Sequence, residues 1–497
     1  MSDATGRLSR SVDDEARRIV FGATADASID ADLAIMTEID RAHLVMLAER
    51  GFVEGASAAC VIDAISRLRA DDFAPLRGRS APRGLYLLYE SYLIEQLGMS
   101  AAGALHSGRS RNDLGAALFR IRARRGYAHL IDALATLLHV VLERSERYAT
   151  MTMPLYTHFQ PALPSTYGHY LVAIGAALAR DLDALVAAGA ELDASPLGAG
   201  AGGGTSLPID CARTMELLGF TRVIPSSIDA VAARDLALRL LAAASILGVT
   251  LGRCATDLLL WTSAEYGLLT LSDHLVGSSS MMPQKRNPFL LEHVQSRNLA
   301  ALSGFMQAAS SMHAAPYTNS IAVGTEGTSP LGHGLQSVTD SCDLLRLVLA
   351  DARPDEARML ERAESGYTCA TELANRLTVA GVPFRQAHHV VGDLVSRAIA
   401  DGGATLAETA ARHGLPKPGI DVTAIDAAAV AQATRHGGGP NRETVAAARS
   451  AIGAQVQSAL AIAAQRRSGW AQAAERLDRA VAELHQRHGG ATARTGS

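Results

Sequence analysis

The chain has 497 residues, and 46 Lys and Arg residues nearly balance 50 Asp and Glu residues, which gives a net charge of −4 at pH 7. With 48% apolar and 19% charged residues, the composition is that of a globular protein and excludes global disorder. The lack of an overall positive charge argues against nucleic acid as a partner. Five dispersed cysteines without a Cys-x-x-Cys pair argue against a disulfide framework and against a zinc knuckle.

Aromatic residues make up only 4% of the chain while alanine is abundant, so we expect an all-α fold. Residues 1–18 are polar and lack the apolar segment of a secretory signal. The most apolar stretch, residues 246–261, is interrupted by Arg253 and Asp257 and predicts a buried core helix instead of a membrane span. These features favour a cytoplasmic protein that has no membrane partner.

In chain order, three units are expected. Residues 1–108 have the pattern of short helices with polar turns. Residues 109–364 contain long Ala- and Leu-rich periodic segments at about 114–149, 165–193, 227–263 and 288–314. Residues 365–497 return to short helices and end in a frayed tail. The long central helices predict an elongated bundle that is shared between subunits, because helices this apolar must be covered.

Two polar loops border the first long helix. Residues 105–113 place Arg109, Ser110, Arg111 and Asn112 just before its start, where a helix N-terminus and guanidinium groups favour a carboxylate ligand. The alternative is an ordinary helix cap with solvated arginines. Residues 156–161 follow the same helix and carry His158, which on its own is more often a packed or surface residue than a catalytic one.

Of two further loops, one is interpreted as a structural turn and the other as part of a functional site. The glycine-rich segment 196–206 lacks the strand-turn-helix context of a dinucleotide site and is interpreted as a turn between helices. Residues 277–288 contain three serines, Lys285 and Asn287 in one loop. Lys285 is one of only two lysines in an arginine-rich chain, which indicates a site that needs a compact ammonium group.

The sequences of these loops resemble those of the argininosuccinate lyase branch of the aspartase/fumarase superfamily. The segments that carry the resemblance are HSGRSRND, MPLYTHFQPALPSTYGH, SPLGAGAGGGTSLPID, GSSSMMPQKRNP and GVPFRQAH, in the order expected. The resemblance extends from about Ser28 to the turn at 437–441. It implies an all-helical, three-domain protomer that forms a homotetramer around a 20-helix core, with each active site built from three subunits. The implied reaction eliminates fumarate from a succinyl group on nitrogen and needs neither a metal nor an organic cofactor.

The resemblance also assigns roles to particular residues. Ser279, six residues before Lys285, is implied to be the base that removes the Cβ proton, and His158 to be the second proton-transfer residue. Because the family usually has glycine where this chain has Ser278, Ser280 stays open as a rival base. Lys285 and Asn287 are implied to stabilise the negative charge of an aci-carboxylate intermediate. The expected substrate contacts are Ser28, Arg109, Ser110, Arg111, Asn112, Thr157, Ser280, Met282, Asn287, Tyr317 and Arg234.

The chain departs from the branch on the amine side of the implied pocket. In the segment 317–326 the expected glutamine is Ala322 and the expected lysine is Thr325, so a carboxylate on the leaving group would lose a charged partner. The pair before Arg234 has become Ala232-Ala233, and an expected upstream histidine is missing from residues 86–91. The sequence therefore favours an aminocarboxylate such as ethylenediamine disuccinate over argininosuccinate.

Other interpretations remain open at this stage. Argininosuccinate is the second candidate substrate. Loss of ammonia from aspartate is a third possibility, which the sequences HSGRSRND and YTHFQ disfavour. A non-catalytic structural paralogue is the alternative of a different class. The adjacent histidines His388 and His389 are expected to have a packing or surface role and not to bind a metal.

Overall fold

The computed structural model describes residues 26–79, 81, 84–417, 419–422 and 425–488. It is 71% helical, which confirms the all-α class. The strands of the described part form only two-stranded pairs: β1 (Thr152–Thr157) with β2 (Gln160–Thr166), β3 (Ala194–Ser195) with β4 (Arg222–Val223), β5 (Leu269–Thr270) with β8 (Arg353–Pro354), and β6 (Gly277–Ser278) with β7 (Arg286–Asn287).

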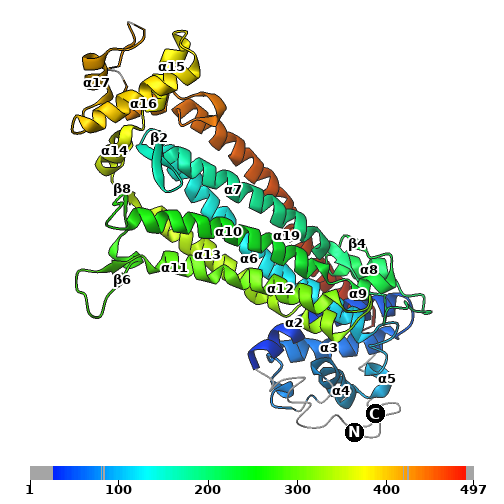
Figure 1. Cartoon of the computed structure of the whole chain (residues 1–497). Helices are drawn as coiled ribbons and strands as arrows, with labels where there is room; N and C mark the ends of the chain where they lie inside the picture. Colours follow the sequence, from blue (N-terminus) through cyan, green and yellow to red (C-terminus); the bar gives the residue numbers. More distant parts are fainter. Residues whose placement is uncertain (1–25, 80, 82–83, 418, 423–424, 489–497) are drawn as a thin grey trace.

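A bundle of long helices forms the body of the molecule (Figure 1). Its members are α6 (Arg111–Arg147), α7 (Tyr167–Ala188), α10 (Asp235–Thr262), α11 (Phe289–Arg297), α12 (Leu299–His313) and α13 (Pro330–Asp351). Leu134, Leu178, Leu247 and Leu345 are fully buried in the core that these helices share. In the described part, α10 alone is long and apolar enough to cross a membrane, and half of its most apolar window is buried, as in a core helix.

A smaller helical region lies at one end of the bundle (Figure 1). It contains α2 (Asp26–Glu49), α3 (Gly55–Ala70), α4 (Leu85–Leu97) and α5 (Met99–Ala102), beside α8 (Cys211–Leu217) and α9 (Ser227–Ala232). Leu44, Ile62 and Leu93 form its core, together with Leu114 at the start of α6.

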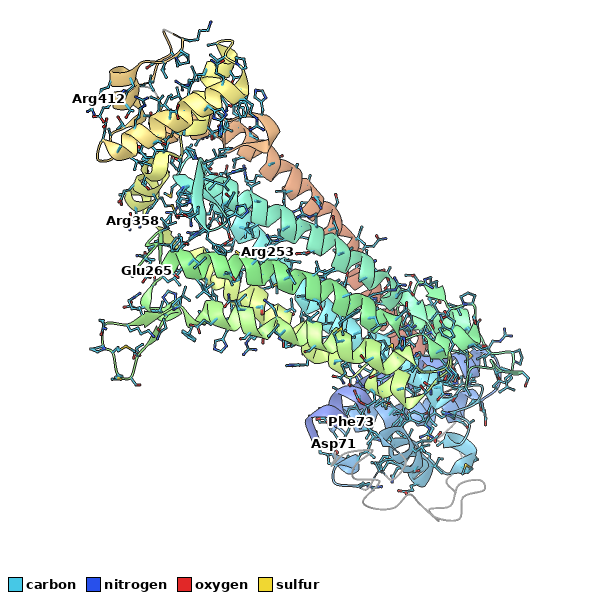
Figure 2. The ribbon with its side chains drawn as sticks, viewed as in Figure 1. Asp71, Phe73, Arg253, Glu265, Arg358 and Arg412 are labelled. Carbon is cyan, nitrogen blue, oxygen red and sulfur yellow. The ribbon has the colours of Figure 1, made fainter. Side chains whose placement is uncertain are left out.

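A cap lies at the opposite end of the bundle. It contains α14 (Glu356–Glu364), α15 (Ala370–Val379), α16 (Phe384–Ala400), α17 (Leu406–His413) and α18 (Ala427–Ala433). Leu373, Val391 and Leu406 belong to a separate small core there. Figure 2 marks the two ends: Arg412 lies in the cap, and Asp71 and Phe73 lie in the region at the other end.

The longest helix, α19 (Arg442–His488), connects these ends along the bundle. Its 47 residues span about 70 Å at 1.5 Å per residue. Val456 is buried in the bundle core and Leu477 in the core of the N-terminal region. The prediction that residues 365–497 return to short helices was wrong for α19, which is long because it packs along the bundle and outside the cap. The proposed borders at 108 and 364 stay predictions.

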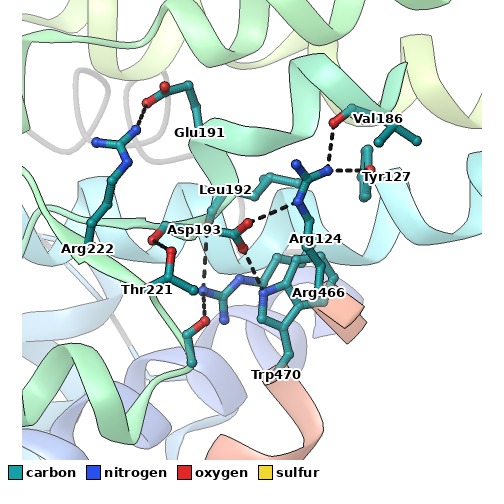
Figure 3. A network of polar contacts seen from close by, with 11 residues as sticks. Arg124, Tyr127, Val186, Glu191, Leu192, Asp193, Thr221, Arg222, Arg466 and Trp470 are labelled. Carbon is teal, nitrogen blue, oxygen red and sulfur yellow. Dashed lines mark hydrogen bonds and ion pairs between the residues drawn. The ribbon is translucent and has the colours of Figure 1, made fainter. Parts of the chain in front are cut away.

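A polar network fixes α19 to the bundle (Figure 3). Arg466 Nε donates to Asp193 Oδ2 at 3.0 Å, and Trp470 Nε1 donates to Asp193 Oδ1 at 3.2 Å. The Arg124 guanidinium lies 5.0 Å from the Trp470 ring centroid and donates to the carbonyl of Leu218 at 2.8 Å. These contacts hold α6, α19 and the segment after α7 in one arrangement.

The expected long helices are found with two interruptions. The segment 227–263 is divided into α9 and α10, because Ala233 has an extended backbone (φ −71°, ψ 119°) and Arg234 is the N-cap of α10. The segment 288–314 is divided at Asn298, whose buried side chain packs against Gly248. The polar loop expected at residues 156–161 is the tip of the β1–β2 hairpin, whose strands were not expected from the sequence.

Candidate active site

The serine-rich loop is the turn of the β6–β7 hairpin. Gly277 pairs with Asn287 and Ser278 with Arg286, so Lys285 lies in the connecting loop just before β7. Arg286 anchors this hairpin through an ion pair with Asp273 and a 2.7 Å hydrogen bond from its Nη2 to the Leu271 carbonyl. Figure 1 shows the loop projecting from the bundle beside α11.

Ser279 occupies a distinctive position in this loop. Its Oγ accepts the backbone N–H groups of Met281 at 3.3 Å and of Met282 at 3.0 Å. Hydrogen bonds to the charged form of a group favour that form, so two N–H donors stabilise an alkoxide on Ser279. Ser280 is exposed and no such pair of donors reaches its hydroxyl among the described hydrogen bonds. The arrangement suits Ser279 for proton abstraction.

Lys285, Met282 and Ser280 share the exposed loop with Ser279, and Asn287 is half-buried in β7. Met281 next to them is 87% exposed, although it is a large apolar side chain.

Thr157 and His158 lie at the tip of the β1–β2 hairpin. His158 and Phe159 both have positive φ angles, of 52° and 61°, and they form a two-residue turn between the paired residues Thr157 and Gln160. Such a turn normally uses Asn or Gly, because Gly has no Cβ and Asn tolerates positive φ better than most residues, so Phe159 in particular is strained there. Backbone strain of this kind concentrates at functional sites, where it fixes the direction of a side chain.

A cavity of about 210 Å³ lies beside this turn. His158, Tyr156, Trp261 and Asp257 line it, and the Asp257 carboxylate accepts a 2.9 Å hydrogen bond from Tyr170 in α7. His158 itself is exposed within the single chain.

The third group of expected site residues lies at the start of α6. Ser110 caps the helix: its Oγ accepts the Asn112 N–H at 3.2 Å, and its own N–H donates to Asp113 Oδ1 at 2.9 Å. Arg111 and Asn112 therefore occupy the first turn, where the helix dipole favours a bound carboxylate.

The glycine-rich segment completes this end of α6. Gly198 and Gly200 donate their N–H groups to Asp113 Oδ2 at 3.2 and 3.0 Å. Gly198 has a φ of +97°, and a Cβ there would lie 2.2 Å from the Cys211 sulfur. The segment is thus an ordered support for Asn112, whose Nδ2 donates to the Ala201 carbonyl at 3.3 Å.

Tyr317 and Asn319 come from the segment that follows α12. The Tyr317 hydroxyl donates to Asp229 Oδ1 at 2.5 Å, and Asn319 Nδ2 donates to Asn112 Oδ1 at 2.9 Å. The hydrogen bond to Asp229 raises the pKa of Tyr317 to about 12, so the phenol stays protonated. Neither Asp229 nor Asn319 was identified from the sequence, although Asp229 lies only a few residues before the altered Ala232-Ala233 pair.

Two expected substrate contacts are buried. The Arg109 side chain is 1% exposed and pairs with Asp40 at 2.6 Å, and it also donates to the Tyr86 hydroxyl at 2.7 Å. Arg234 is 3% exposed, and burial lowers its pKa to about 10. Both arginines are thus buried within the single chain, and the substrate contact expected of them stays a prediction.

Ser28 lies in α2, but its side chain falls outside the described residues. No group of three or more His, Cys, Asp or Glu side chains in the described part is arranged to hold a metal ion. His388 and His389 lie on α16 in the cap, with their ring centroids 6.1 Å apart.

The three groups of residues do not meet within one chain. Arg111 begins α6, which is about 55 Å long at 1.5 Å per residue, and the β1–β2 hairpin follows its far end. The hairpins β1–β2 and β6–β7 lie near the cap end, whereas Tyr317 bonds Asp229 beside the α6 start (Figure 1). The residues that the sequence assigns to one site therefore lie toward opposite ends of this chain.

Comparisons with known proteins agree over most of the chain. The family model described as lyase matches residues 54–300, and the model described as argininosuccinate lyase C-terminal matches residues 367–418. Argininosuccinate lyase of Methanothrix thermoacetophila is 35% identical, over 74% of this chain and 75% of that protein. The enzyme of the same name from Methanoculleus marisnigri is 36% identical, over 85% and 87%. A solved EDDS lyase variant with bound fumarate matches with a TM-score of 0.84 and 28% identity, over 96% of this chain and 99% of that one.

Proposed function

The chain belongs to the argininosuccinate lyase branch of the aspartase/fumarase superfamily, and from this we propose that its substrate is an N-substituted aspartate other than argininosuccinate. The protein is a carbon-nitrogen lyase that eliminates fumarate from a small-molecule substrate. The substrate proposal adds to this reaction class the identity of the amine that leaves.

The proposed reaction begins at Ser279. Its Oγ takes a proton from Cβ of the succinyl group, and the electron pair moves into the neighbouring carboxylate to form an aci-carboxylate. Lys285 and Asn287, with backbone N–H groups of the loop, stabilise the two negative oxygens; one such donor is worth about 10²–10³ in rate. The observation that carries this assignment is the pair of N–H donors on the Ser279 oxygen.

The C–N bond then breaks, and the alkene of fumarate forms. His158 and Thr157, at the fixed tip of β1–β2, orient the substrate and assist the amine as it departs. Arg111, Asn112 and Ser110 hold the succinyl carboxylates at the start of α6. Ser28, Ser280, Met282 and Tyr317 remain proposed substrate contacts.

The substrate proposal depends on the segment 317–326. Ala322 and Thr325 lie on a single π-helical turn (Ala322–Glu326), where neither side chain can form a charge-assisted bond with a carboxylate. Binding of argininosuccinate would leave the carboxylate of its arginine part without that partner, at a cost of about 1.5–3 kcal/mol. Ethylenediamine disuccinate has no guanidinium group, and its leaving amine carries carboxylates at a different distance from the reacting nitrogen, so it does not depend on the charged partner that Ala322 and Thr325 replace.

Argininosuccinate is the second candidate, because two relatives at 35% and 36% identity are argininosuccinate lyases. A tolerated change in how the arginine part is bound would make it the substrate. The two candidates differ in the amine and share the reaction.

We further propose a homotetrameric, cytoplasmic enzyme that works without a metal or organic cofactor. An exposed apolar stripe supports the subunit contact: Ile246 and Val249 on α10 are 57% and 58% exposed, and Leu299, Leu302 and Met306 on α12 are 62%, 47% and 58% exposed. Apolar groups at helical spacing that face outward are typical of a buried contact between chains.

The assignment of the base is tested with Ser279→Ala and Ser280→Ala, assayed by the ultraviolet absorbance of released fumarate. We expect Ser279→Ala to lose at least about 10³ in kcat, because no other group removes the proton. Ser280→Ala is the matched control and is expected to keep activity within about tenfold, since it removes at most one hydrogen bond. The opposite order would assign the base to Ser280.

A further inference from the structure

One acidic group lies beside the proposed succinyl site without an assigned role. Asp229, in the first turn of α9, is half-buried and accepts the Tyr317 hydroxyl at 2.5 Å. Tyr317 is 69% exposed, so the pair borders open space. The Asp229 carboxylate forms no ion pair within the described part of the chain.

This pair is adjacent to the carboxylate-binding end of α6. Tyr317 and Asn319 belong to one short segment, and Asn319 donates to Asn112, which lies in the first turn of α6. A substrate whose succinyl group is held at Arg111 and Asn112 would thus extend its amine part along Tyr317 toward Asp229.

Asp229 and Asp235 both act as negative charges on Tyr317. Glu326 is the only charged residue between Tyr317 and residue 326, and it is exposed. Asp235 is engaged by Arg239 at 3.0 Å. The nearby cation Arg120 interacts electrostatically with Asp229, but its guanidinium is buried and donates to the Ala116 carbonyl at 3.2 Å.

We propose that Asp229 binds a positively charged group on the departing amine and thereby selects it. The amine would be a small diamine or a related compound that carries a second cationic nitrogen, as ethylenediamine disuccinate does. A partly desolvated carboxylate attracts an ammonium group more strongly than an uncharged or an anionic end, which gives selectivity. This inference rests on the proposed function and names the class of its amine.

The test uses the reverse reaction, because it allows amines of equal size to be compared. The amine nitrogen forms the C–N bond to one alkene carbon of fumarate and loses one proton, and the other carbon receives a proton from Ser279. Ethylenediamine, propylamine and β-alanine supply a cationic, an uncharged and an anionic end in nearly the same length. The decrease in fumarate absorbance gives kcat and KM for each amine.

The variant is Asp229→Asn, which keeps an acceptor for the Tyr317 hydroxyl and removes the charge. Asp235→Asn is the matched control, since it removes a nearby acid that already has an arginine partner. Circular dichroism on both variants checks that the helical fold is kept.

We expect the wild type to favour ethylenediamine over propylamine by about tenfold or more in kcat/KM, and β-alanine to be the poorest. In Asp229→Asn this preference falls about tenfold through the KM of the diamine, while propylamine is unchanged. In Asp235→Asn the preference persists.

Equal use of the three amines, or a preference that survives in Asp229→Asn, would overturn this inference and leave the proposed function intact. Addition of none of the amines, with fumarate released from argininosuccinate alone, would overturn the proposed function together with the inference.

Discussion

At the scale of single residues, the structure distinguishes between serines that look alike in the sequence. Three consecutive serines offer three hydroxyls, yet Ser279 is the one whose oxygen accepts two backbone N–H groups. Serine is a poor base because its alkoxide is unstable, so the donors that reach the oxygen decide which hydroxyl can act. This property depends on the turn of the loop and cannot be deduced from residue types.

A pH prediction also belongs to this scale. Burial, together with Arg109 and Arg111, lowers the pKa of His106 to about 4, and burial lowers the pKa of His43 well below its usual value. Between about pH 6.5 and 4 these two histidines bind more protons in the unfolded chain than in the folded one, so their contribution to stability falls as pH falls through this range. For His106, which is 32% exposed, the loss at pH 5 is on the order of 1 kcal/mol.

Chemical denaturation at pH 7 and pH 5 checks this expectation. His106→Asn should reduce the difference in unfolding free energy between the two pH values, because Asn does not titrate. His139→Asn, at an exposed histidine of α6, should leave the difference unchanged. Equal pH dependence in the wild type and in His106→Asn would contradict the assignment.

At the scale of elements, the sequence predicts the long helices well and the short irregular ones poorly. Apolar residues at helical spacing identify α6, α7 and α10 because packing imposes that period. The β1–β2 hairpin was missed because His158-Phe159 lacks the Asn-Gly pair that normally marks its turn. The position of α19 was missed as well, since an Ala-rich helix with many polar residues does not reveal what it packs against.

The site is predictable in part. The family resemblance assigns roles to Ser279, His158 and Arg111 because their motifs are specific, and these roles stay predictions. It does not reveal that Arg109 is buried against Asp40, since that depends on a contact with α2. Nor does it reveal Asp229, whose relation to Tyr317 exists only once α9 and the segment after α12 are folded together.

Two adjacent arginines of α19 give a test at this scale. Arg466 pairs with Asp193, and both side chains are less than 15% exposed, whereas Arg467 pairs with Asp132 on the surface. Arg466→Ala would leave the Asp193 carboxylate largely buried without its ion-pair partner, although Trp470 would still donate a hydrogen bond to it. We expect a loss of about 3 kcal/mol in unfolding free energy. Arg467→Ala should cost about 1 kcal/mol or less, because an exposed pair contributes little.

Urea denaturation of the two variants measures both values under the same conditions. Similar losses for Arg466→Ala and Arg467→Ala would contradict the role of the Asp193 network in fixing α19.

At the scale of the whole molecule, the distance between the groups of site residues is the dominant fact. The start of α6 and the β1–β2 hairpin are separated by the length of that helix, yet the proposed reaction requires both near one substrate. The proposed homotetramer would resolve this, because copies placed side by side in opposite directions would bring different ends together. The exposed apolar stripe of α10 and α12 is the surface that we propose for that contact.

Mixed assemblies test this arrangement. Ser279→Ala and Arg111→Ala should each be inactive alone, because each removes one part of every site. If the two parts come from different subunits, mixing the variants in equal amounts during refolding or co-expression should restore about a quarter of the wild-type activity. Mixtures that stay inactive, despite forming oligomers of wild-type size, would contradict shared sites.

The most direct test of the central claim measures fumarate release from a panel of substrates. The purified protein would receive argininosuccinate, L-aspartate and ethylenediamine disuccinate, with fumarate followed by its ultraviolet absorbance. The account predicts rapid release from ethylenediamine disuccinate and slow or no release from argininosuccinate, because Ala322 and Thr325 cannot replace the charged partner of the arginine part. Rapid release from argininosuccinate would contradict it and make the protein an argininosuccinate lyase in function as well as in family.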